Sequence, residues 1–388
     1  MTAGAPTVAP ETVSVERGAA RWSFLYRGAT ARAVAETVFI RAGALAFSLV
    51  LFGAFVGFAG ADPFDVFYQM GRGSFGSSFS VQNTLLRAAP LMLTALCTAI
   101  PARLGLVVIG GEGALIVGGL AATACGLWLH GFSPWFVATS MAVAGTGAGG
   151  VWVGLAGALR AYRGVNETIS SLLLTYIAVA LLSHLVEGPM RDPASLNKPS
   201  TRAIAPEDMV HAMPGLDVHW GLIYGVVACL IGYVMMVRSV FGFACSIVGG
   251  NHRVGLLCGL PVRRMILVSC LLGGGAAGAA GMLEVAAVHG RANESLVAGY
   301  GYTGILVSFM ARHNPLGIVP VALLLGGIGA SNGLLQRVDH LPDATVSVLQ
   351  GILFVVILGS ETLYGRMKLF KPRASAERAA PVTEAALG

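Results

Sequence analysis

The sequence has 388 residues, of which 55% are hydrophobic and only 11% are charged. A water-soluble domain of this length does not need so many apolar residues to fill its core, so the composition excludes an ordinary soluble protein. The formal net charge is +6, but the basic residues lie at the ends of apolar segments and do not cluster with aromatic residues, which argues against nucleic acid as a partner.

The chain begins with a polar segment, residues 1–41, that carries several arginines before the first apolar run. A cleaved signal peptide has its apolar segment directly after a short basic start, so this layout predicts a cytoplasmic N-terminal tail. A second basic cytoplasmic tail is predicted at 364–388. Between the two tails, residues 42–363 are predicted to form one transmembrane domain.

Apolar stretches recur throughout residues 42–363, most of them near the length of about 20 residues that a spanning helix needs. They predict an all-α, polytopic helical bundle of about ten transmembrane helices. The stretch 302–310 is too short to cross alone, because nine helical residues rise only about 14 Å, and it is predicted to be a half-helix or to start near Glu294. The predicted spans are 42–60, 84–102, 106–129, 134–159, 169–185, 220–237, 265–288, 302–310, 316–335 and 345–363.

The basic residues favour an orientation with both termini in the cytoplasm, because this places most of them on the inner side. The outer loop 186–219 is then long and proline-rich, and it is predicted to present a docking surface for an extracytoplasmic partner. The inner loop 238–264 is apolar and rich in glycine, with room for one short helix around Asn251 to Cys258. We expect that helix either to dock into another subunit or to lie on lipid headgroups.

Small residues recur at every fourth position in two of the predicted spans. Such faces let helix backbones approach closely in lipid, so they predict a tightly packed bundle. The residues concerned are Gly110, Ala114 and Gly118 in the third span, and Gly274 and Gly278 in the seventh.

Two carboxylates, Glu112 and Glu284, lie inside apolar spans. Leaving an ionised side chain against lipid at mid-membrane costs about 3 kcal/mol or more, so each is expected to face a cavity or a partner. Glu112 is predicted to lie in a helix that is buried on both sides or broken at Gly110 and Gly111. Each carboxylate has two open interpretations: it lines the transport path, or it locks two helices together through hydrogen bonds.

The sequence lacks the patterns that would predict an enzyme or a metal site. It has no GxxxxGK[ST] phosphate loop, so ATP binding by that route is not expected, and no GxSxG or HExxH motif. The six cysteines are scattered without metal-ligand spacing. We therefore expect no catalytic residues, no metal and no cofactor bound by this chain.

Several stretches resemble one family, the permeases of ATP-binding-cassette (ABC) importers for branched-chain amino acids, ribose-like sugars and nucleosides, and most of all its nucleoside and simple-sugar branch. The segment from Arg103 to Gly113 is similar to the family pattern R-A-G-x-F-N-I-G-x-E-G-Q. Two further stretches similar to the family follow in order: NETISSLLLTYIA, which starts at a helix-capping Asn166, and GPMRDP. The last two similar stretches are EVAAVHGR, from Glu284, and GYGYTGILVSFMARHNPLGI, from Gly299. The resemblance covers roughly residues 84 to 365.

This resemblance implies a transport subunit of the bacterial inner (plasma) membrane that imports a nucleoside or a similar small polar solute. It also implies three partners: a cytoplasmic ATPase that binds ATP and Mg, a second permease subunit (a homologous chain or a second copy), and an extracytoplasmic binding protein or lipoprotein. The inner loop would be the coupling helix that inserts into the ATPase. The residues expected to couple are Gly250, Asn251, Arg253, Gly255 and Gly259.

In the third span the chain departs from the family pattern at two amide positions, which are Val108 and Ala114 here, and Thr175 replaces another amide in the fifth span. Losing the two amides of the third span removes hydrogen-bonding capacity that a sugar would use. The motif set as a whole favours a nucleoside over the alternative, a ribose-like sugar. Tyr176, Tyr302 and Phe309 are candidates for stacking on a base. An alternative from another class is an ion-coupled secondary transporter in which Glu112 or Glu284 carries a proton or cation.

Overall fold

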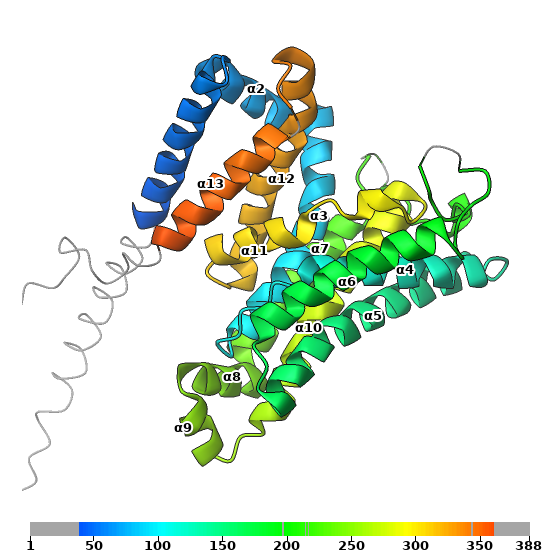
Figure 1. Ribbon diagram of the computed structural model, residues 1–388, viewed down its shortest axis with the longest axis vertical. Helices are drawn as coiled ribbons and strands as arrows, with labels where there is room; N and C mark the ends of the chain where they lie inside the picture. The colour runs from blue at the N-terminus through cyan, green and yellow to red at the C-terminus, as the bar shows by residue number, and fades with distance from the viewer. Residues whose placement is uncertain (1–38, 196–197, 214, 216, 343, 361–388) are drawn as a thin grey trace, which may run out of the picture. The chain divides into compact units, whose positions relative to one another are not determined.

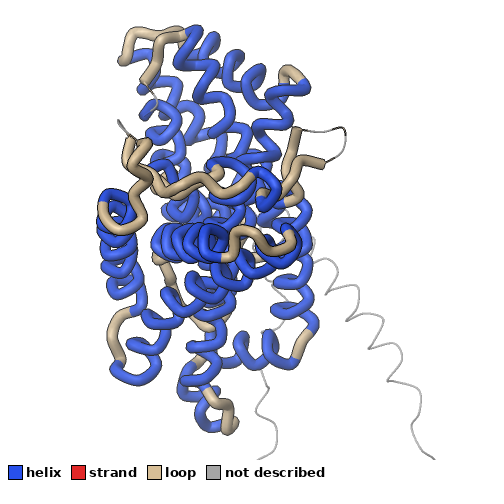
Figure 2. Tube along the Cα trace, turned by 90° about the vertical axis from the view of Figure 1, so that its right-hand side faces the viewer, coloured by secondary structure: helices blue, strands red, loops and turns tan. Residues whose placement is uncertain are grey.

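The computed structural model describes residues 39–360 except 196, 197, 214, 216 and 343. This described part consists of helices and loops, with isolated β-bridges and no named strand, which confirms the predicted all-α class (Figure 2). The predicted C-terminal tail and nearly all of the N-terminal tail lie outside the described residues. Contacts divide the chain into a large unit, Val50–Phe354, and a small unit that includes residues 39–49 and 355–360.

Eight helices within the described residues are long and apolar enough to cross a membrane. Two shorter helices, α11 (Tyr300–Met310) and α13 (Ala344–Ser360), account for the remaining predicted spans. The short α11 confirms the predicted half-helix. The eight long helices are Phe39–Phe58, α3 (Ser78–Ala102), α4 (Gly111–Trp128), α5 (Pro134–Arg163), α6 (Glu167–Glu187), α7 continued by the π-helix η2 (Gly221–Arg238), α10 continued by the π-helix η3 (Val262–His289), and α12 (Pro315–Val338).

Further short helices lie in the connections. The inner loop holds two of them, α8 (Val240–Gly250) and α9 (His252–Leu257), where the sequence predicted one. α9 matches the predicted helix, whereas α8 was missed because its apolar residues resemble the continuation of a span. The others are α2 (Pro63–Phe75) and the single-turn 3-10 helices η1 (Pro206–Asp208) and η4 (Glu294–Leu296).

Several helices begin at a capping side chain. Asn166 accepts hydrogen bonds from the backbone N–H groups of Thr168 and Ile169, as expected at the start of α6. Asn251 caps α9 and Asn314 caps α12 in the same way. These caps fix the first residues of α6, α9 and α12.

The core of the large unit is the crossing of α4, α5 and α10, which pack side by side (Figure 1). A Cβ atom on Gly149 of α5 would lie only 2.5 Å from the Cα of Gly278 of α10, and one on Gly118 of α4 would collide with the same residue. Three backbones can therefore meet here only because these positions are glycine. Gly274 packs against Gly149 one turn away.

Candidate functional site

The chain between α3 and α4, residues 103–110, is not helical, and we call it the connector. Its backbone polar groups find partners on neighbouring helices. The Thr168 hydroxyl donates to the carbonyl of Val107 (2.7 Å), and the Ile109 N–H donates to the hydroxyl of Ser171 (3.1 Å). Thr98 donates to the carbonyl of Val108 (3.2 Å). Irregular backbone at membrane depth is tolerated only where protein groups satisfy it in this way.

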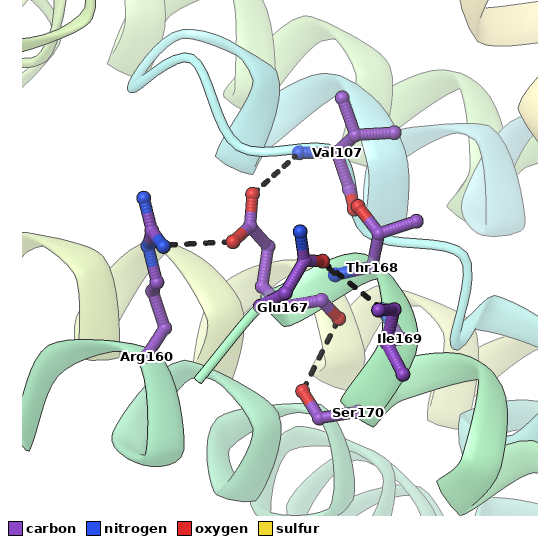
Figure 3. Close-up of polar contacts among 7 residues, drawn as sticks. Val107, Arg160, Glu167, Thr168, Ile169 and Ser170 are labelled. Carbon is purple, nitrogen blue, oxygen red and sulfur yellow. Dashed lines mark hydrogen bonds and ion pairs between the residues drawn. The ribbon is translucent and has the colours of Figure 1, made fainter. Parts of the chain in front are cut away.

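A buried carboxylate, Glu167, holds the connector to two helices (Figure 3). It is the first residue of α6, and its Oε1 accepts a hydrogen bond from the Val107 N–H (3.4 Å). Its Oε2 lies 3.3 Å from Nε of Arg160, in the last turn of α5. One side chain thus joins α5, α6 and the connector. The sequence showed Glu167 only as part of a helix start.

Glu112 binds the N-terminus of the half-helix α11. Its Oε1 accepts a hydrogen bond from the N–H of Gly299 (2.8 Å), and its Oε2 accepts one from the N–H of Gly301 (2.5 Å). These N–H groups have no partner within α11, because the first N–H groups of a helix never do. The side chain is fully buried. A Cβ atom on Gly301 would lie 2.5 Å from the Cα of Glu112, so glycine is needed for this close approach.

The start of α4 also explains how a carboxylate fits into an apolar stretch. The helix begins at Gly111, so Glu112 lies in its first turn and is not in mid-helix. Its neighbours across the bundle belong to α11. Of the two interpretations left open by the sequence, this geometry supports a helix lock.

Glu284 lies where α10 changes into the one-turn π-helix η3, and it is 4% exposed. Its Oε2 is 3.6 Å from Nδ1 of His289 in the same turn. It also interacts electrostatically with Arg87 of α3 and with Glu112. The structure therefore gathers the two intramembrane carboxylates and one arginine into a single electrostatic group. One-turn π-helices of this kind are frequent at functional sites.

The three aromatic candidates do not form one cluster. Tyr176 of α6 and Tyr302 of α11 are both exposed and lie near each other. Phe309 lies about 10 Å further along α11, where its ring packs edge-on against His313 (4.9 Å between centroids) and Phe354 (6.2 Å). Tyr176 and Tyr302 thus remain together as a candidate pair, and Phe309 belongs to a separate aromatic group.

His313 lies in the turn after α11, and its ring is held by the Ser308 hydroxyl at 2.9 Å. Burial, together with the positive charges of Arg103 and Arg312, lowers the pKa of its imidazole to about 4. The ring is therefore neutral at physiological pH and serves as a packing partner of Phe309.

A polar cavity of about 120 Å³ lies beside the N-terminal turns of α11. Its walls come from α3, α11, α12 and α13. The Thr303 hydroxyl donates to Oε1 of Gln350 (3.2 Å) across two of these walls. Sequence reasoning missed this site, although polar side chains inside apolar spans were a signal for it. Its polar lining residues are Arg87, Tyr300, Thr303, Asn332, Ser347 and Gln350.

Val108 and Ala114, the two positions in the third span that lack the family amides, are fully buried in one core cluster with Cys97 and Ala277. Neither lines the polar cavity. In the conformation described here, the loss of these two amides therefore does not disfavour a sugar as the solute.

The inner loop presents an apolar tip at one end of the large unit, where α8 and α9 lie together (Figure 1). Leu256 and Leu257 of α9 are 56% and 87% exposed. Gly255, by contrast, packs against Val248 of α8, and Gly259 ends the segment with φ of 73°, a value that favours glycine. α9 is thus held rigidly against α8 while its leucines point outward.

The inner loop also contacts the connector. A Cβ atom on Gly249 of α8 would collide with the carbonyl of Arg103, and one on Gly105 would lie 3.6 Å from the carbonyl oxygen of Gly249. Gly250 and Arg253 are exposed, and Asn251 caps α9. A displacement of α8 would therefore reach the connector directly.

The outer loop folds back on the end of α10. Bridges join Arg191 to Thr201 and Ser200 to Asn293, and the carboxylate of Asp208 lies 3.6 Å from Nδ1 of His130. The loop thus has a defined surface on the side opposite to α9.

The family model described as branched-chain amino acid transport system / permease component matches residues 80–358. The chain is 31% identical over 313 residues to the glucose ABC transporter permease protein TsgB13 of Haloferax volcanii, which covers 77% of this chain and 81% of that protein. It is 29% identical over 303 residues to the guanosine ABC transporter permease protein NupP of Bacillus subtilis, a match that covers 74% of this chain and 84% of that protein. A probable riboflavin import permease protein, RfuC of Treponema pallidum, is 24% identical over 284 residues, which cover 70% of this chain and 72% of that protein.

Proposed function

We propose a function from one premise: the chain belongs to the family of branched-chain amino acid transport system permease components. It is a multi-pass membrane protein and a permease subunit of an ABC importer, with a transport role and not an enzymatic one. The observation that carries this conclusion is the family match, which includes the connector, Glu112, α9 and the half-helix α11.

The energy source we propose is a separate cytoplasmic ATPase that docks on α9 and binds the ATP and Mg. Leu256 and Leu257 support this proposal, because exposed leucines on a rigid turn suit an apolar groove on a partner. The loop that carries them touches the connector, so movement of the ATPase would be passed into the membrane domain. The chain itself is proposed to bind no cofactor.

The solute we propose is a nucleoside. The guanosine permease NupP supports this choice, and so does the pair of exposed tyrosines, Tyr176 and Tyr302, which suits stacking on a base. A simple sugar is the second candidate, because the glucose permease TsgB13 is 31% identical to this chain. Both solutes are neutral and rich in hydroxyl groups.

Two further partners complete the proposal: a second permease subunit, either a homologue or another copy, and an extracytoplasmic binding protein that docks on the outer loop. The assembly would lie in the bacterial inner membrane. An apolar, exposed face of α6 supports contact with a second permease, formed by Ile169, Leu173, Tyr176 and Ile177.

The ion-coupled alternative has weaker support where Glu112 is the carrier, and Glu284 is the other carboxylate it could use. To carry a proton or cation, Glu112 would have to exchange its hydrogen bonds with Gly299 and Gly301 in every cycle. That exchange would leave two N–H groups of α11 without partners in an apolar setting.

Uptake by the complete transporter in proteoliposomes tests the function. We expect import of radiolabelled guanosine or glucose that needs ATP, stops when the ATPase is inactivated by mutation, and persists after a protonophore is added. Import that continues with the inactive ATPase and collapses with the proton gradient would instead support the secondary transporter.

A further inference from the structure

We propose that the polar cavity beside α11 is a subsite for the hydroxyl-rich part of the solute, namely the sugar ring of a nucleoside or a free sugar. This inference rests on the proposed function, because it assigns a place for the solute within the same importer. The cavity is distinct from the exposed pair Tyr176 and Tyr302, neither of which lines it.

The chemistry of the lining matches sugar hydroxyls. Each hydroxyl of a sugar both donates and accepts a hydrogen bond, and so do the side chains of Ser, Thr, Tyr, Asn and Gln. The cavity is lined by Thr303, Ser347 and Gln350, together with Tyr300 and Asn332. Inside apolar helices such side chains need hydrogen-bond partners, which a hydroxylated solute in the cavity would supply.

One hydrogen bond already orients part of this lining. The Thr303 hydroxyl donates to Oε1 of Gln350, which ties α11 to α13. With its oxygen turned toward Thr303, the Gln350 amide presents its NH₂ group in another direction. A fixed amide donor is what a preformed solute site requires.

The charge of the cavity favours a neutral solute. Arg87 is the one charged residue among its lining residues. Its guanidinium interacts electrostatically with the buried Glu284, and Tyr300 interacts with both groups. The other polar lining residues carry no charge and offer hydroxyl and amide groups, which suits a neutral, hydroxylated solute.

The size of the cavity indicates a subsite. Its volume is about 120 Å³, whereas pockets that enclose a whole drug-sized ligand measure about 300–1,000 Å³. One hydroxylated ring is therefore a better occupant than an entire nucleoside, whose base would have to extend outside.

The position of the cavity also connects it to the machinery of the importer. Tyr300 and Thr303 belong to the first turn of α11, whose N-terminus is held by Glu112. Glu112 follows the connector, and the connector touches α8. A movement that starts at the inner loop thus has a short covalent and hydrogen-bonded route to the wall of the cavity.

Two substitutions change the cavity while leaving the helix packing in place. A Cβ atom on Gly329 would lie 3.6 Å from Cδ of Arg87, which is ordinary contact, so Gly329→Val fills space in the cavity without striking a backbone. Gly333→Val is the matched control, because Gly333 lies one turn later on α12 with nothing within 4 Å. Gln350→Leu removes the oriented amide at nearly constant size.

The complete transporter is assayed for uptake of two solutes that differ only in hydroxyl groups. The measured quantity is the uptake rate of guanosine divided by that of 2′,3′-dideoxyguanosine. If glucose is the solute carried, glucose is compared with 2-deoxyglucose. Wild type and Gly333→Val should prefer the fully hydroxylated solute equally. Gln350→Leu should reduce that preference about 5- to 10-fold, as expected for one lost hydrogen bond. Gly329→Val should reduce total uptake at least about 5-fold by occupying the space.

The possible failures are distinguishable. If wild type imports neither guanosine nor glucose with ATP, the proposed function is overturned and the subsite with it. If wild type imports one of them and both cavity variants keep its uptake and its preference, only the subsite is overturned. Should Gly329→Val fail to fold, Gly329→Ala provides the same test with a smaller side chain.

Discussion

Glu112 shows how a single residue makes an unusual backbone possible. A half-helix that begins inside a membrane exposes N–H groups that lipid cannot satisfy, and each such group would cost several kcal/mol. The carboxylate of Glu112 takes two of them, from Gly299 and Gly301. The sequence predicted that this carboxylate needed a partner, but it gave no indication that the partner would be backbone almost 190 residues away.

Replacing Glu112 should destabilise the protein in proportion to the hydrogen bonds lost. Glu112→Gln keeps one acceptor oxygen and should cost about 1–3 kcal/mol, and Glu112→Ala, which leaves both N–H groups bare, should cost about twice as much. Thermal unfolding of the purified protein in detergent measures the difference. Thr123→Val on the same helix, which loses only a hydrogen bond to the carbonyl of Gly119, is the control. Equal melting temperatures for Glu112→Ala and wild type would contradict the lock.

At the scale of elements, the connector is the part of the fold that joins the inner loop to the interior. Its first residues touch α8, its middle is hydrogen-bonded to α6, and its end leads into Glu112. The Arg160–Glu167 pair fixes it from the side (Figure 3). Because Arg160 is partly exposed, the pair contributes little to stability. We infer that its role is to position the connector.

Arg160→Ala should therefore uncouple transport from ATP hydrolysis without unfolding the chain. We expect the amount of solute imported per ATP to fall at least about 3-fold, with a loss of stability below about 1 kcal/mol. Arg163→Ala is matched to it, since Arg163 is an exposed arginine in the same last turn of α5. The measurement is uptake and ATP hydrolysis on the same proteoliposomes. If the two variants import the same amount of solute per ATP hydrolysed, the Arg160–Glu167 pair does not position the connector.

The elements predictable from the sequence were those set by local composition. Each predicted span overlaps an observed helix because apolar length is a property of consecutive residues, and α9 lies where the apolar inner loop had room for one short helix. The polar cavity was missed because residues such as Arg87, Thr303 and Gln350 are far apart in the chain and meet only after folding. For the same reason Phe309 was grouped with two tyrosines that it does not touch.

At the scale of the whole molecule, the large unit is a tightly crossed bundle with different surfaces at its two ends. The crossing of α4, α5 and α10 leaves no room for side chains at Gly118, Gly149 and Gly278. We expect the three helices to move together as one rigid group, because their backbones are in direct contact. Changes of state should then be concentrated in the connector, α11 and the loops.

Assembly with the ATPase should depend on the apolar tip of α9. Replacing Leu256 and Leu257 by serine removes exposed apolar surface and should reduce co-purification of the ATPase at least about 10-fold, while the permease stays folded. Cys258→Ser is the control, because Cys258 is exposed in the same segment and changes little in size. Pull-down from detergent extracts measures the effect. Undiminished co-purification of the double variant would place the docking surface elsewhere.

The lock between α4 and α11 has an electrical consequence. Both helices begin beside the Glu112 carboxylate, and the two N-termini together carry about one positive elementary charge, which offsets it. Moving a single unbalanced charge across the membrane would cost about 2.3 kcal/mol per 100 mV. Because Glu112 and the two helix starts offset each other, a rearrangement that moves them together would carry little net charge across the membrane.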